Sequence, residues 1–147
     1  MYMYIEKASE ATDELYQALR RLISQLGIHK ISPTREELAI LLNTQGAILL
    51  IAREPDQNGE IVGVLSLTIY RVPTGVRSIV EDVVVDEKMR RRGIGEALMH
   101  EAINLAREAD ANGVSLTSNL QREAANLLYQ SMGFQLRKTN PYFYKLK

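Results

Sequence analysis

A short segment combines glycines and arginines directly after an apolar run. Residues 90–95 read Arg-Arg-Arg-Gly-Ile-Gly, follow three valines at 83–85, and lead into a long amphipathic stretch. Glycine lets the backbone pass close to a ligand, and the first turn of a helix presents N–H groups without intrahelical partners. Phosphate and pyrophosphate groups bind at such places. The segment therefore predicts an anion cradle for a phosphorylated cofactor.

Two familiar phosphate-binding patterns do not fit this segment. A P-loop needs Gly-x-x-x-x-Gly-Lys-Ser/Thr, which the chain lacks, and a dinucleotide fingerprint needs a third glycine where this chain has Leu98. What remains is a strand, an acidic turn at residues 86–88, and Arg-x-x-Gly-x-Gly at a helix start. A lone Gly-x-Gly can also be purely structural, with Arg91 and Arg92 as a solvated first turn.

The composition excludes several kinds of catalysis. The 147 residues are 46% hydrophobic and 24% charged, which is typical of a globular chain, and we expect one domain over residues 1–147. The absence of cysteine excludes disulfides, thiolate catalysis and zinc–thiolate sites. The two histidines, His29 and His100, lie far apart, so we expect no metal centre and no Ser-His-Asp triad.

Charge and hydropathy limit the partners. Lys plus Arg and Asp plus Glu both number 18, which argues against a dedicated nucleic-acid binder. No apolar stretch approaches the ~20 residues that a membrane span needs. The first six residues show no basic region ahead of an apolar segment, so we expect no signal peptide and a cytoplasmic protein.

The hydrophobic pattern predicts an α/β fold. Strands are expected at residues 2–7, 47–52, 61–70, 77–85 and 114–117, with a final hairpin of 134–138 and 142–146. Helices are expected at residues 12–26, from 33–37 onward, at 94–111 and at 118–132. Thr34 with Glu37, and Ser118 with Gln121, have the spacing of a capping box. This order predicts one mixed layer of strands with helices on both faces.

Two blocks of the sequence resemble the signatures of one enzyme family. Arg-x-x-Gly-x-Gly at residues 90–95, after the valines, resembles the acetyl-CoA signature of the GNAT family of N-acetyltransferases. Ala-x-x-Leu-Tyr-x-x-x-Gly-Phe at residues 125–134 resembles their C-terminal signature, and the spacing of the blocks also matches. The resemblance implies the GNAT fold, with a mixed, mostly antiparallel central sheet, and an acetyl-CoA-dependent N-acetyltransferase.

The resemblance also implies cofactor contacts by position. Backbone groups of the three valines pair with the pantetheine arm, and N–H groups of the following loop cradle the pyrophosphate. Asn126 shares a helix face with Tyr129 and is expected to face the coenzyme as well. Arg122 stands where many members carry Asn, which leaves that one contact open. The expected cofactor-binding residues are Val83, Val84, Val85, Arg90, Arg91, Arg92, Gly93, Ile94, Gly95, Glu96 and Asn126.

Two residues are candidates for proton transfer. Tyr129 matches the family's tyrosine near the coenzyme sulfur, and a phenol of pKa ~10 can protonate a departing thiolate of pKa ~8.5. Glu81 is the candidate base that takes a proton from the incoming ammonium, directly or through water. Alternatively, Tyr129 is a core tyrosine, and Glu81 pairs with Arg77 or Arg71 across the sheet. On a regular strand, Glu81 would share one face with residues 83 and 85.

The acceptor is the least constrained part of the interpretation. It is expected to enter over the two early helices and residues 70–77, which carry no motif. A small-molecule amine and a peptide amine both fit. A rival function is a non-catalytic acetyl-CoA or CoA-binding regulatory module, which would keep the cradle without needing Glu81 or Tyr129. The aromatic C-terminal hairpin is a surface through which two copies could form a homodimer.

Overall fold

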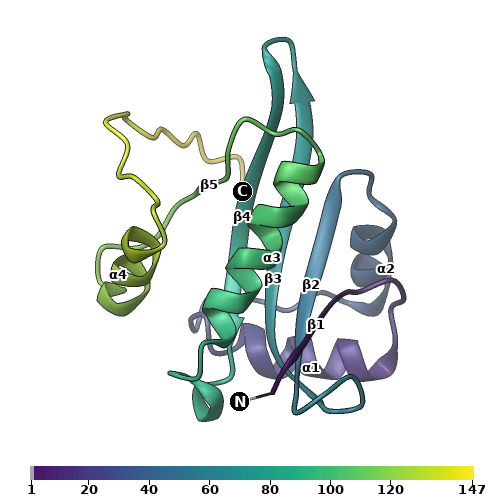
Figure 1. Cartoon of the computed structure of the whole chain (residues 1–147). Coiled ribbons are helices and arrows are strands. Elements are labelled where there is room, and N and C mark those ends of the chain that lie inside the picture. Colours follow the sequence, from purple (N-terminus) through teal and green to yellow (C-terminus); the bar gives the residue numbers. More distant parts are fainter. Residues whose placement is uncertain (1) are drawn as a thin grey trace. The chain divides into compact units, whose positions relative to one another are not determined.

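The computed structural model describes residues 2–147 and divides into two compact units, one up to Thr117 and one from Ser118 to Lys147. The first unit contains a five-stranded sheet in the order β1-β2-β3-β4-β5 (Figure 1). Neighbouring strands are antiparallel except β4 and β5, which are parallel. This confirms the expected mixed, mostly antiparallel sheet. The strands are β1 (Tyr4–Lys7), β2 (Ala47–Glu54), β3 (Glu60–Val72), β4 (Gly75–Val85) and β5 (Ser115–Leu116).

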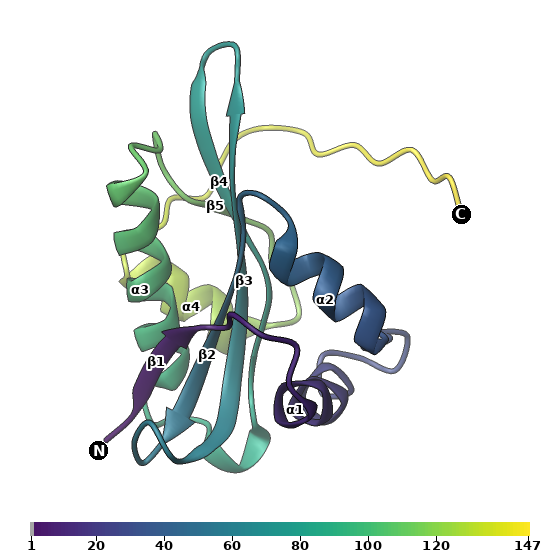
Figure 2. The ribbon, with the colours of Figure 1, turned by 90° about the vertical axis from the view of Figure 1, so that its right-hand side faces the viewer.

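Helices cover both faces of this sheet, as expected. Figure 2 shows α1 (Asp13–Ile23) and α2 (Arg35–Asn43) on one face and α3 (Ile94–Glu108) on the other. On the other face, α3 packs closely against Gly63 of β3. A Cβ added at Gly63 would lie 3.3 Å from both Ile94 Cγ2 and Leu98 Cδ1. On the opposite face the helices bury one apolar cluster. Its members include Leu15, Leu19, Leu22, Leu38, Leu49, Ile51, Val64 and Val84.

The first two helices begin with side-chain caps. Thr12 precedes α1, and its Oγ1 accepts a hydrogen bond from the Leu15 N–H at 3.1 Å. Thr34 precedes α2 and forms the predicted capping box: its Oγ1 accepts from the Glu37 N–H at 3.1 Å, and Glu37 Oε1 accepts from the Thr34 N–H at 2.9 Å. These bonds satisfy N–H groups that the first helical turn leaves free.

The second unit holds α4 (Glu123–Ser131), which starts later than expected. The capping box predicted at Ser118 and Gln121 is wrong, because the Arg122 N–H bonds to the Asn119 carbonyl at 3.1 Å and closes a turn before the helix. The end of α4 follows the prediction. Gly133 adopts a φ of 98°, and the Phe134 N–H donates to the Tyr129 carbonyl at 3.0 Å.

The predicted C-terminal hairpin is also wrong, because residues 133–147 contain no strand. Alternating apolar residues form a strand only where a partner takes up their backbone hydrogen bonds and covers their side chains, and an isolated hairpin is marginal in water. The homodimer expected through this hairpin stays a prediction. Its apolar side chains are exposed: Leu136, Tyr142, Phe143, Tyr144 and Leu146.

Helix lengths bear on membrane association. Over residues 2–147, none of the helices combines the length and the apolar character that crossing a bilayer requires.

Candidate functional site

Strand β4, which carries Glu81 and the three valines of the expected site, contains a β-bulge. Val84 lies opposite Val64 of β3, whereas Glu81 lies opposite Ser66, so β4 has one residue more than β3 between these pairs. The bulge contains Asp82, whose φ of 49° is in the left-handed region that aspartate tolerates better than most residues. Bulges bend a strand and re-aim its side chains, and they are frequent beside active sites.

This bulge corrects the expected arrangement of side chains on β4. Val64 and Ser66 are two residues apart on β3 and share a face, so their partners Val84 and Glu81 also share a face. The expectation that Glu81 shares a face with Val83 and Val85 assumed a regular strand and is wrong. Val84 belongs to the apolar cluster under α1 and α2, which places Glu81 on the side of the sheet that these two helices cover.

Glu81 is exposed on this face. Its cross-strand neighbour is Ser66, while Arg77 lies opposite Tyr70 and donates from Nη2 to Thr74 Oγ1 at 2.7 Å. Within the described part of the chain no ion pair joins Glu81 to Arg77 or Arg71. The side chain is thus a carboxylate open to solvent beside a bulged strand.

Beyond the bulge, β4 has one edge without a strand partner. The pairing with β5 joins Ile79 to Ser115 and Val80 to Leu116. Residues 81–85 continue past this pairing, and no other strand of the described chain meets them on that edge. An unpaired strand edge presents backbone N–H and C=O groups. An extended amide-containing chain can add there as a further strand.

The chain then turns through η1 (Glu87–Met89) into a loop that opens α3. Arg91 has a φ of 66° and Gly93 a φ of 81°, so two residues of this loop are in the left-handed region. Gly93 is the N-cap of α3 and has no side chain to accept from the first turn. A Cβ on Gly93 would meet no atom of the described chain within 4 Å, which leaves space in front of the loop. The arrangement suits an anion on the helix N-terminus.

The three arginines of the loop have different surroundings. Arg90 Nε donates to the Val85 carbonyl at 3.2 Å and so ties the loop to the end of β4. Arg92 Nη1 donates to Glu54 Oε1 at 2.8 Å, and the Glu54 side chain is only 13% exposed. Arg91 is exposed. Sequence reasoning missed Glu54, because no local pattern links the end of β2 to a loop 38 residues later.

Tyr129 and Asn126 belong to the second unit. Tyr129 is the buried residue of α4, and its ring packs edge-on against Phe134 at 5.9 Å between centroids. Burial raises the pKa of the Tyr129 phenol, and the charge of Arg122 lowers it in part, so the hydroxyl keeps its proton at neutral pH. Asn126 donates from Nδ2 to the carbonyls of Asn119 and Arg122, at 2.9 and 2.8 Å. Any contact of Asn126 with a coenzyme would therefore use Oδ1.

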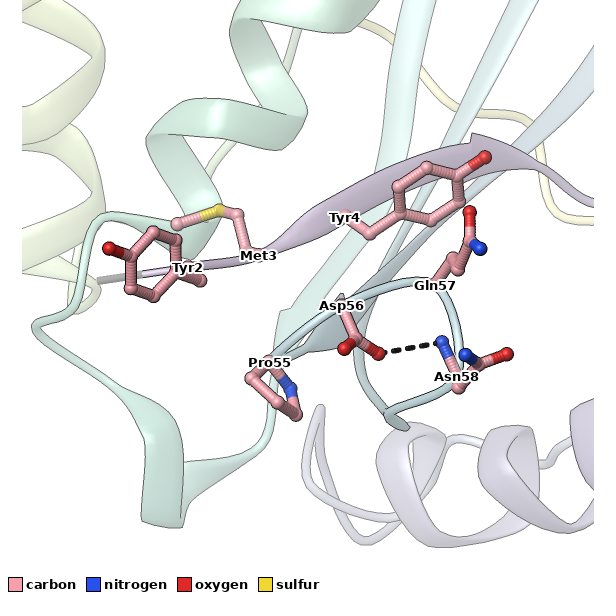
Figure 3. Close-up of a pocket in the computed structure, with 7 residues that line it drawn as sticks. All are labelled: Tyr2, Met3, Tyr4, Pro55, Asp56, Gln57 and Asn58. Carbon is pink, nitrogen blue, oxygen red and sulfur yellow. Dashed lines mark hydrogen bonds between the residues drawn. The ribbon is translucent and has the colours of Figure 1, made fainter.

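A hollow of about 490 Å³ lies at another place on the first unit. Figure 3 shows its walls, which come from the start of β1 and from the turn between β2 and β3. None of the site residues expected from the sequence lines it. Its lining residues are Tyr2, Met3, Tyr4, Pro55, Asp56, Gln57 and Asn58.

The sequence of the chain is similar to those of acetyltransferases. The family model described as "Acetyltransferase (GNAT) family" matches residues 11–134. The chain is 33% identical over 91 residues to N-acetyltransferase family 8 member 3 of Rattus norvegicus, a match covering 60% of this chain. The matched stretch spans 39% of that relative's length, so the chain matches only about two fifths of it.

Solved structures share the fold over nearly the whole chain. An aminoglycoside acetyltransferase from an uncultured soil metagenomic sample, in complex with sisomicin, has a TM-score of 0.84 at 21% identity, covering 99% of this chain and 97% of that one. Glucosamine-6-phosphate N-acetyltransferase from Arabidopsis thaliana has a TM-score of 0.79 at 19% identity, covering 98% and 99%. A transcriptional regulator from Bacillus halodurans C-125 has a TM-score of 0.80 at 24% identity, covering 98% and 100%.

Proposed function

The chain belongs to the acetyltransferase (GNAT) family, and we propose that it transfers the acetyl group of acetyl-CoA to a primary amine. One observation carries this proposal: the unpaired edge of β4 is followed, after the short η1, by a glycine loop with left-handed residues that opens α3. The family model crosses from the first compact unit into the second, which supports treating both as one acetyltransferase domain.

The residues present fit the coenzyme. The edge formed by Val83, Val84 and Val85 would hold the pantetheine amides, and backbone N–H groups from Arg91 to Glu96 would hold the pyrophosphate. The open space in front of Gly93 supports this assignment. The bond from Arg92 to Glu54 favours a role for Arg92 in holding the loop, and Arg91 is the better candidate for a phosphate contact.

Three groups would carry the chemistry. Glu81 accepts a proton from the ammonium, directly or through water, so that the neutral nitrogen attacks the thioester carbon. Backbone N–H groups near Val84 stabilise the negative charge that develops on the carbonyl oxygen. Tyr129 donates its phenol proton to the thiolate as the carbon–sulfur bond breaks, and its raised pKa means that the phenol carries this proton at neutral pH before the step.

Amino sugars are the first acceptor class to test. Two proteins of the same fold are an aminoglycoside acetyltransferase and a glucosamine-6-phosphate N-acetyltransferase. A small hydroxylated amine would reach Glu81 on the face that α1 and α2 cover. Peptide amines belong in the same panel, since the two early helices and residues 70–77 carry no motif that selects one class of acceptor.

The test is a thiol-release assay with acetyl-CoA and a panel of amino sugars, small amines and peptides. We expect turnover on at least one amine and a fall in kcat of about 100-fold or more in Tyr129→Phe, because a positioned general acid contributes 10²–10⁴-fold. Tyr142→Phe is the matched control, since Tyr142 is 91% exposed. Tight acetyl-CoA binding without turnover on any amine would instead identify a regulatory coenzyme-binding module.

A further inference from the structure

We propose that Arg21, in the last turn of α1, and Gln25, in the turn that follows α1, are positioning residues of the coenzyme site: they hold the segment from which the pyrophosphate loop departs. The inference rests on the proposed function, because it assigns the loop at residues 90–95 to the coenzyme. It adds residues from an element far away in the sequence, which no part of the family motif contains.

Gln25 holds the segment through its backbone. Gln25 Oε1 accepts a hydrogen bond from the N–H of Glu87 at 2.9 Å. Glu87 is the first residue of η1, and η1 ends one residue before Arg90. A side chain 62 residues earlier in the chain thus fixes the start of the segment that leads into the loop.

Arg21 holds the preceding residue, Asp86. Arg21 Nε lies 3.4 Å from Asp86 Oδ2, and Arg21 Nη2 donates to the Ile61 carbonyl at 2.6 Å. Asp86 is 7% exposed, and it also accepts at Oδ1 from the Lys88 N–H at 3.2 Å. Burying a carboxylate costs free energy unless it is paired and hydrogen-bonded. Asp86 therefore has both a hydrogen bond and an opposite charge beside it, and Arg21 supplies the charge.

The sheet also contacts this segment and the loop after it. The Asp86 N–H donates to the Val62 carbonyl at 2.8 Å, and Arg92 reaches Glu54 on β2. The segment before the loop is thus fixed between the sheet and α1. The loop itself contains Arg91 and Gly93 in the left-handed region, where the backbone needs support from its surroundings.

This arrangement predicts an effect on coenzyme affinity rather than on chemistry. A loop held in its binding conformation costs less ordering when the ligand arrives, so affinity is higher. Loss of the Gln25 contact would free the start of the segment that leads into the loop, without touching Glu81 or Tyr129. The KM for acetyl-CoA should rise, while kcat and the KM for the amine should stay near the wild-type values.

The experiment compares Gln25→Leu with Gln17→Leu, the same change at an exposed position of α1. Acetyl-CoA binding is measured by isothermal titration calorimetry, kinetics by thiol release, and the exchange of the Glu87 amide proton by NMR. We expect Gln25→Leu to raise the Kd and KM for acetyl-CoA about 2- to 10-fold, the range of one lost hydrogen bond, and to speed exchange at Glu87. Gln17→Leu should behave as wild type.

The possible results separate the two proposals. An unchanged Kd for acetyl-CoA in Gln25→Leu, despite faster exchange at Glu87, would overturn the positioning role and leave the proposed function standing. An equal fall in kcat and in affinity would also overturn it, since that result indicates a general structural defect. If the wild-type protein does not bind acetyl-CoA, the proposed function fails and the positioning role fails with it.

Discussion

Helices α2 and α3 begin in opposite ways. The start of α2 is closed, because Thr34 and Glu37 each bond to the other's backbone N–H. The start of α3 is open, because its N-cap is Gly93, which has no side chain and adopts a left-handed φ. A closed start satisfies its own N–H groups and contributes to stability, whereas an open start leaves them for an anion. The comparison supports the proposed coenzyme site, because the N–H groups at the start of α3 have no side-chain cap.

The largest effect is expected from placing a bulky side chain at Gly93, the uncapped start of α3. In Gly93→Val a β-branched side chain must adopt a φ of 81°, where it is strongly disfavoured, and it occupies the space in front of the loop. We expect acetyl-CoA affinity to fall about 100-fold or more, measured by calorimetry, because both the cradle's shape and its accessible N–H groups are lost.

The control for this change is Gly113→Ala. A Cβ at Gly113 also meets no atom of the described chain within 4 Å, but this glycine lies outside the loop. Acetyl-CoA affinity should stay at the wild-type value. Wild-type affinity in Gly93→Val, with the fold intact by circular dichroism, would mean that the start of α3 does not hold the coenzyme.

The next largest effect is expected from removing the side-chain cap at the start of α2. Thr34→Ala removes the cap of α2, and we expect the free energy of unfolding to fall by about 1 kcal/mol, the usual worth of an N-cap. Acetyl-CoA affinity should not change. Urea denaturation measures the first quantity and calorimetry the second. Glu37→Gln keeps an acceptor at Oε1 and should leave stability nearly unchanged, because Gln also completes a capping box.

The same comparison shows what a sequence can reveal. The capping box at Thr34 and Glu37 was predictable because its partners are three residues apart and an apolar stripe follows. Ser118 and Gln121 have the same spacing, yet the chain there makes a turn at Asn119 before α4 begins. Capping-box spacing alone is therefore not sufficient to predict a helix start, since turns use the same polar residues.

In the candidate site, too, some features involve neighbours in the sequence and others involve residues far apart in it. The loop around Gly93 is readable because strand, glycines and helix follow one another in the chain. The bulge at Asp82 is not readable, because it exists only as a mismatch in residue number between β3 and β4. Glu54 and Gln25 were equally hidden, since each meets the loop from an element folded against it. Such contacts require the tertiary structure.

The smallest expected effect concerns α1, whose first turn is closed by an ion pair as well as a cap. Arg53 donates from Nη1 and Nη2 to the two Glu14 carboxylate oxygens, at 2.9 and 2.8 Å. These bonds lower the pKa of Glu14 below its ordinary value of 4.5. Because the folded pKa is the lower one, the pair stabilises the fold above the unfolded pKa. That stabilisation is lost as the pH falls through the folded pKa.

Glu14→Gln should remove this pH dependence. Since the Glu14 side chain is 54% exposed, solvent screens the pair, and we expect a loss of only about 0.2 to 1 kcal/mol at pH 7. The difference from wild type should shrink toward zero as the pH is lowered well below 4.5, measured by urea unfolding from pH 7 to pH 3. Glu36→Gln, in the first turn of α2, is the matched control. If the free energies of unfolding of the two variants depended on pH in the same way, the pair with Arg53 would not stabilise the start of α1. The side-chain cap alone would then distinguish the start of α1 from that of α3.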